Sequence, residues 1–140
     1  MKRYLLYFLL LFAFACKHKE HKVIEKKYED GSPRIVSIYE DNDTTKNKIG
    51  ETQYYNNGKM LSDGKMKSGL RDGLWVSYYD NGQKWSENNY KNGVLDGKTS
   101  TWYPNGKPQY VGAYKDNMPI GKWKFWAQNG VDVIEKDYTK

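Results

Sequence analysis

The sequence predicts an all-β protein, built as an antiparallel meander of β-hairpin repeats. Three observations predict it. Glycines recur at a fixed step of 24 residues, Asn-Gly dipeptides recur at the same step, and so do tyrosines and tryptophans. A fixed period of this length is typical of repeat architectures, in which each unit packs on its neighbours. Seven structural glycines follow the period: Gly58, Gly73, Gly82, Gly97, Gly106, Gly121 and Gly130.

The N-terminal residues 1–15 read as a signal peptide. Lys2 and Arg3 precede an uncharged apolar run, residues 4–14, which is shorter than the roughly 20 residues of a membrane-spanning helix. Small residues flank the bond before Cys16, the single cysteine of the chain. This arrangement resembles the bacterial lipoprotein signal, which implies lipidation of Cys16 and attachment to a bacterial membrane of the cell envelope, on the periplasmic side or the surface. Ordinary cleavage after Ala15 and an uncleaved anchor are the alternatives.

Residues 16–26 follow as a lipidated cysteine and a charged tether. The stretch mixes lysines with glutamates and holds little apolar content, so it is expected to stay solvated. His18 and His21 are too few to form a metal site without further ligands and a supporting shell, so no metal is expected. The lysines beside the lipid could touch anionic head groups.

The repeat array is expected over residues 27–140. Three full units span 54–77, 78–101 and 102–125, and half a unit follows. An older copy precedes them, marked by Tyr28, Gly31 and Tyr39. Its distance to the next unit is three residues longer, and the polar stretch 40–48 is where a longer connection costs little.

Each unit carries two turn signals. Both residues of an Asn-Gly dipeptide tolerate a positive φ, so Asn81-Gly82 and its equivalents are expected to form tight type I′ turns. The second signal, residues 92–97, is expected to form a six-residue bend. Strands are predicted between the turns, at 83–91 and 98–103, for a total of roughly nine or ten.

Alternation along the second strand of each unit predicts two different faces. One parity carries Trp75 and Trp123 and is the expected inner face. The other parity mixes lysines with aromatic residues, so it is expected to face water or a partner. Its members form the candidate binding face: Tyr78, Trp102, Trp126, Lys98, Lys122 and Lys124.

The phrases at 72–79 (DGLWVSYY), 78–83 (YYDNGQ) and 102–107 (WYPNGK) resemble the MORN repeat, in the variant form found in bacterial proteins. The resemblance covers residues 27–140, with Thr99 in the place of a tryptophan and Ala127 in the place of an aromatic residue. It implies an elongated curved sheet and a role in binding rather than chemistry. Many bacterial members are labelled antitoxins, and others are scaffolds or associate with membranes.

An enzyme is not expected, and no cofactor is expected. No histidine lies outside the tether, so the commonest general base is absent, and Asp72 and Asp96 are better explained as turn residues before glycines. After loss of Lys2 and Arg3 with the leader, the net charge falls from +6 to +4, which is too weak to indicate nucleic acid.

The sequence therefore predicts a non-catalytic envelope lipoprotein that binds a protein partner, with a toxin as one possibility in an immunity-like role. The alternative is a module that binds cell-wall glycans or anionic lipid through exposed aromatic columns. Exposure of Tyr78, Trp102 and Trp126 is the feature that distinguishes the two.

Overall fold

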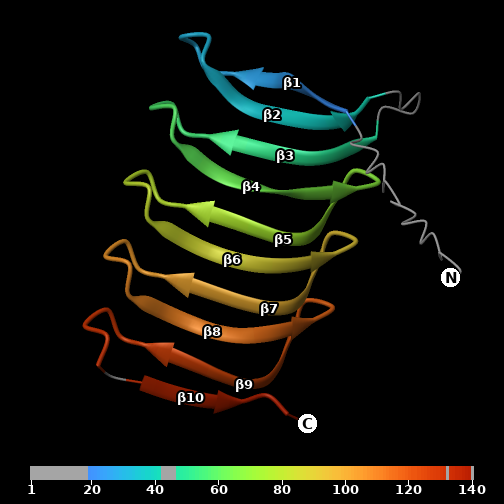
Figure 1. The fold of residues 1–140 in the computed structure, drawn as a ribbon. Helices are drawn as coiled ribbons and strands as arrows, with labels where there is room; N and C mark the ends of the chain where they lie inside the picture. Colours follow the sequence, from blue (N-terminus) through green and yellow to red (C-terminus); the bar gives the residue numbers. More distant parts are fainter. Residues whose placement is uncertain (1–18, 42–46, 132, 140) are drawn as a thin grey trace, which may run out of the picture.

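The computed structural model describes residues 19–41, 47–131 and 133–139, which form a single antiparallel sheet whose strands follow one another in chain order (Figure 1). The strands are β1 (Glu20–Lys27), β2 (Pro33–Glu40), β3 (Lys48–Tyr54), β4 (Met60–Lys67), β5 (Leu70–Tyr78), β6 (Lys84–Lys91), β7 (Val94–Trp102), β8 (Pro108–Lys115), β9 (Met118–Trp126) and β10 (Val133–Asp137).

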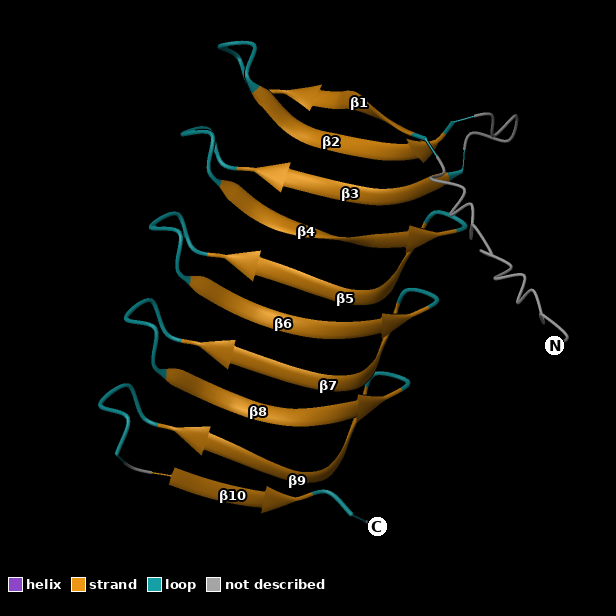
Figure 2. Ribbon diagram, viewed as in Figure 1, coloured by secondary structure: helices purple, strands orange, loops and turns teal. Residues whose placement is uncertain are grey.

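The predicted all-β meander is confirmed. Every regular element in the described ranges is a strand, the sheet is open at both edges, and the strands bend along their length (Figure 2). Within these ranges there is no helix long and apolar enough to cross a membrane. The predicted signal peptide, residues 1–15, and the lipidation site Cys16 lie outside the described residues.

The structure corrects the boundary between the tether and the array. Residues 20–27, most of which were assigned to the solvated tether, form β1 and pair with β2 from Glu20 opposite Glu40 to Lys27 opposite Pro33. All eight side chains of β1 are exposed, so the strand is held by backbone pairing rather than by burial. Charge is typical of an edge strand, where lysines discourage pairing with other chains. The composition that indicated a tether therefore fits an edge strand equally well.

The type I′ prediction for the Asn-Gly turns is wrong. None of the asparagines in these dipeptides has a positive φ, while the glycines do, Gly82 at 88°. The Gly82 amide donates to the Tyr79 carbonyl at 2.9 Å, and the Tyr79 amide donates to the Gln83 carbonyl at 2.8 Å. This is a three-residue loop with a left-handed glycine. Asn81 serves through its side chain, because its Oδ1 accepts the Gln83 amide at 2.8 Å.

The two-residue type I′ turns lie at the opposite ends of the strands, where a six-residue bend was expected. Asn92 and Gly93, with φ of 49° and 84°, connect β6 directly to β7. Ser68-Gly69 and Asp116-Asn117 do the same for β4–β5 and β8–β9. Gly97, assigned to the bend, lies inside β7 with φ of 115°. All seven structural glycines named from the sequence have a positive φ.

The older copy is present, and its longer connection runs between the end of β2 at Glu40 and the start of β3 at Lys48, as expected. Residues 42–46 of this connection lie outside the described residues. The Tyr28 hydroxyl donates to the Tyr54 carbonyl, in the same role as the tyrosines of the later units.

The two faces of the sheet differ as predicted. The face that carries Trp75, Thr99 and Trp123, here called the tryptophan face, holds the buried rings; Trp75 is 2% exposed and Trp123 is 4% exposed. The opposite face, which carries Lys98, Lys122 and Lys124, is here called the lysine face, and all three lysines are exposed.

Each buried indole lies across a glycine of the neighbouring strand. A Cβ atom built on Gly64 would come within 2.4 Å of the Trp75 ring, and one on Gly112 within 2.2 Å of the Trp123 ring. In the unit between them the pair is Asn88 with Thr99, whose hydroxyl donates to the Asn88 Oδ1 at 2.6 Å. Where the tryptophan is replaced by Thr99, the residue opposite is therefore Asn88 instead of the smaller glycine.

Tyrosine hydroxyls connect successive units. Tyr55 donates to the Tyr78 carbonyl at 2.9 Å, Tyr79 to the Trp102 carbonyl at 2.8 Å, and Tyr103 to the Trp126 carbonyl at 2.8 Å. Each bond crosses one strand, so it links a turn of one unit to a strand end of the next. Burial raises the pKa of the Tyr55 and Tyr79 hydroxyls, which keeps them protonated as donors.

The contact between Gly112 and Trp123 predicts coupled substitutions. Gly112→Asn is expected to cost roughly 1–3 kcal/mol of unfolding free energy through overpacking, and Trp123→Thr roughly 3–5 kcal/mol through lost burial. Together they recreate the Asn88–Thr99 pair, so the double variant is expected to lose at least about 1 kcal/mol less than the sum. Chemical denaturation of the four proteins checks this; strictly additive costs would contradict it.

The tyrosine bonds predict a difference between neighbouring tyrosines. Tyr79→Phe is expected to cost about 1 kcal/mol of unfolding free energy, because it removes the bond to the Trp102 carbonyl. The matched control is Tyr78→Phe, whose hydroxyl has no hydrogen bond within the described residues and whose loss is expected to be near zero. Equal melting curves for the two variants would show that the hydroxyl contributes nothing.

Candidate binding surface

The structure places all six residues of the predicted binding face on the lysine face, on β5, β7 and β9. Tyr78, Trp102 and Trp126 are the last residues of these strands. Strands pack about 4.8 Å apart, so residues on every second strand repeat about every 9.6 Å. The six residues therefore form one continuous surface over the C-terminal half of the sheet.

The three aromatic residues are half-buried rather than open. The Lys84 ammonium lies 5.3 Å from the centre of the Trp102 ring, within the range of a cation–π contact. Their backbone carbonyls accept the tyrosine hydroxyls described above. These residues thus help to hold the units together, and only part of each ring is available to a ligand.

The lysines differ in how far their charge is compensated. Lys124 forms an ion pair with Glu135 at 2.9 Å, and this hydrogen bond lowers the pKa of the Glu135 carboxyl. Lys122 lies near Glu135 and Asp137 and has no ion pair in the described ranges. Lys98 likewise has no carboxylate partner there. The surface therefore presents two lysines without a direct ion pair in the described ranges, Lys98 and Lys122, of which Lys122 lies opposite Asp137 on β10.

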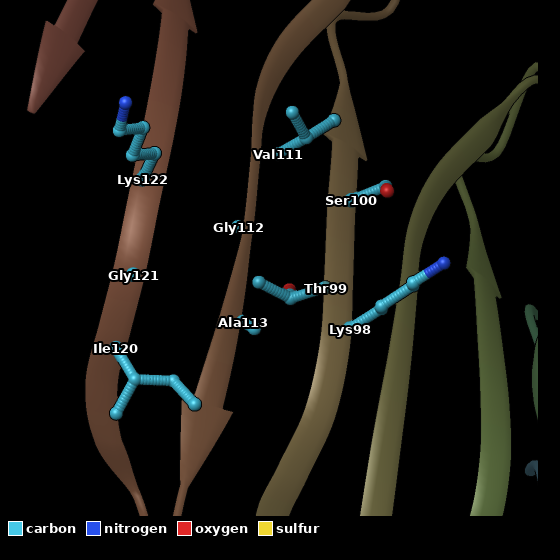
Figure 3. Close-up of a pocket in the computed structure, with 9 residues that line it drawn as sticks. All are labelled: Lys98, Thr99, Ser100, Val111, Gly112, Ala113, Ile120, Gly121 and Lys122. Carbon is cyan, nitrogen blue, oxygen red and sulfur yellow. The ribbon is translucent and has the colours of Figure 1, made fainter. Parts of the chain in front are cut away.

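A hollow of about 380 Å³ lies between these two lysines. Its floor comes from β8, where three small residues follow one another: Val111, Gly112 and Ala113 (Figure 3). Lys98 on β7 and Lys122 on β9 stand on its two sides, and Ile120 closes one end. The arrangement is a shallow apolar floor with one lysine on the strand at each side, which suits an acidic segment with some apolar content.

A second shallow hollow, of about 850 Å³, lies on the same face toward the N-terminal half. Ile38, Gly50 and Val76 contribute to its lining, together with charged residues of both signs such as Asp63 and Lys65. Because its charges are mixed, this part of the face lacks the positive bias of the region between Lys98 and Lys122.

Nothing in the described part of the chain gathers the groups for a metal centre. No cluster of three or more histidine, cysteine, aspartate or glutamate residues that could hold an ion occurs there. His21, one of the two histidines weighed as ligands, instead contacts the Asp41 carboxylate at 2.9 Å. His18 lies outside the described residues.

Sequence reasoning missed the residues that face the tryptophans. Gly64, Asn88 and Gly112 follow the 24-residue step, so the period could have identified them, and the Thr99 exception is matched by the Asn88 exception. The small residues of the hollow's floor have no comparable signal, because Asn89 occupies the place of Ala113 in the preceding unit.

No curated protein matches this chain. The profile of the MORN repeat variant family matches it twice, at residues 71–92 and 95–116. Each match starts in one strand of a hairpin and ends one residue past the next strand, at β5–β6 and β7–β8, and the two matches keep the 24-residue step. The match supports a MORN-repeat protein: at residues 71–92 and 95–116 the chain is similar to the MORN repeat variant.

Proposed function

We propose that this protein is a non-catalytic binding and scaffolding module, attached to the bacterial cell envelope through a lipidated Cys16, whose lysine face holds an acidic protein segment. The observation that carries the proposal is the pair of lysines without direct ion pairs in the described ranges, Lys98 and Lys122, on either side of the small-residue floor of β8. The similarity to MORN repeats supports a binding role for the array.

Complementary charge makes a protein segment a suitable occupant. Acidic side chains would meet Lys98 and Lys122, while short apolar side chains would rest on Val111 and Ala113. The partly exposed rings of Trp102 and Trp126 supply the rigid contact area on which binding energy commonly concentrates. The proposal includes an immunity-like role, in which the partner is a toxin that arrives from outside the cell.

The glycan and anionic-lipid alternative uses the same face. It depends on open aromatic columns at Tyr78, Trp102 and Trp126, and the half-burial of these rings favours the protein segment. The free lysines would serve an anionic lipid as well as an acidic peptide, so the alternatives differ in the partner that is recovered.

Charge reversal tests the face. Lys98→Glu combined with Lys122→Glu is expected to abolish recovery of the envelope partner in crosslinking and co-purification, since opposite charges are replaced by like charges. The matched control combines Lys59→Glu with Lys91→Glu, which changes the net charge equally at exposed sites that do not line the hollow between Lys98 and Lys122. The control is expected to recover the partner as the parent chain does, and recovery is expected to fall at high salt.

Equal recovery by both double variants would contradict the proposed face. Recovery of no protein by the parent chain, together with sedimentation on anionic vesicles that the Lys98/Lys122 variant loses, would favour the lipid alternative.

The anchor is tested separately. The full chain, expressed with its own leader, is expected to show an intact mass that corresponds to cleavage before Cys16 plus acyl chains, and to fractionate with membranes. Cys16→Ser is expected to remove both properties. A soluble, unmodified protein cleaved after Ala15 would show secretion without an anchor and would overturn this part of the proposal.

A further inference from the structure

The tryptophan face carries a row of small hydroxyl side chains that crosses the middle of the sheet. The register places Ser62 opposite Ser77, Ser77 opposite Ser86, and Ser86 opposite Thr101. At its C-terminal end the row meets Tyr110 and Phe125. The row of hydroxyl side chains therefore ends at Thr101, and large aromatic rings take its place on the next two strands.

The missing indole at position 99 leaves space on this face. Trp75 and Trp123 are two repeat steps apart, and the unit between them has Thr99 in the corresponding place. A hollow of about 440 Å³ lies there, and its floor includes Ser77, Ser86 and Thr101. This volume is within the roughly 300–1,000 Å³ that is typical of small-molecule sites.

The walls of the hollow are aromatic. Trp85 stands at one end, and this large aromatic residue is 45% exposed to water. Tyr110 forms a second wall, and Tyr90 a third. Arg71 lies beside Tyr90, with its guanidinium 4.0 Å from the centre of the Trp75 ring, and so supplies donors at the rim.

Several polar groups of the hollow have unused hydrogen-bonding capacity. The Thr101 hydroxyl is buried, in a residue that is 4% exposed, and has no partner within the described residues. The Gln109 carboxamide and the Ser77 hydroxyl line the same hollow and also have no side-chain hydrogen bond in the described ranges. Buried polar groups without partners are uncommon, and the partly exposed Gln109 and Ser77 side chains have free hydrogen-bonding groups in this hollow.

We propose that this hollow is a carbohydrate subsite, which takes one or two residues of an uncharged glycan chain. Sugar rings present apolar C–H faces to aromatic rings and hydroxyls to polar groups at the same time. Trp85 and Tyr110 offer the first kind of contact, and Gln109 and Ser77 offer the second. The hollow contains no carboxylate, so an ammonium ligand lacks a counter-charge there.

This subsite lies on the face opposite Lys98 and Lys122 and is independent of the proposed protein partner. The test is isothermal titration of the full chain with two probes, chitotetraose and cellotetraose. Saturable binding of at least one probe is expected. Trp85→Ala is expected to weaken it at least tenfold and Gln109→Ala several-fold, whereas the exposed control on the other face, Leu74→Ala, is expected to leave it unchanged.

Circular dichroism verifies that the variants fold. If Trp85→Ala fails to fold, Gln109→Ala decides the matter, since its side chain makes no hydrogen bond in the described part of the chain. The proposal is overturned if neither tetrasaccharide binds at a probe concentration of about 10 mM. It is also overturned if Leu74→Ala weakens binding as much as Trp85→Ala. It is also overturned if Trp85→Ala abolishes recovery of the protein partner while no sugar binds.

Discussion

The ten strands form a single layer, and this constraint governs the rest of the structure. A large side chain in a one-layer sheet can be buried only against the strands beside it. Trp75 and Trp123 achieve this by lying across Gly64 and Gly112, where any Cβ atom would collide with the ring. Apart from Val36, the other buried side chains of the described residues are small and polar, among them Ser62, Ser86 and Thr101. The core is thus a set of local cross-strand contacts that repeat along the sheet.

The repeat period accounts for what could be predicted from the sequence. Spaced glycines, Asn-Gly dipeptides and alternating parity were sufficient for the all-β meander, for the buried positions of Trp75 and Trp123 and for the exposure of the lysines. The turn types were assigned to the wrong ends, because Asn-Gly fits a type I′ turn and also fits a loop in which the asparagine side chain accepts a backbone amide. The backbone φ of Asn81 decides between them, and composition does not reveal it.

The site was predictable in part for a similar reason. Parity placed Lys98, Lys122 and Lys124 on one face together with Trp102, but it did not reveal the contact of that ring with Lys84, which reaches it from the neighbouring strand. The strand at Glu20–Lys27 was missed because its side chains are all exposed, so no hydrophobic alternation marks it. The hollow at Trp85 follows from an exception to the repeat rather than from the repeat itself.

The tyrosine bonds end before the sheet does. Tyr28, Tyr55, Tyr79 and Tyr103 bridge β2, β4, β6 and β8, whereas Ala127 stands at the corresponding place beside β10 and carries no hydroxyl. Opening free energies in an array with nearest-neighbour coupling fall where a coupling is missing. Amide hydrogens of β10 should therefore exchange with solvent sooner than those of β8, and fraying should start at this hairpin and progress strand by strand toward β1. The sheet would then unfold one strand at a time from its C-terminal edge.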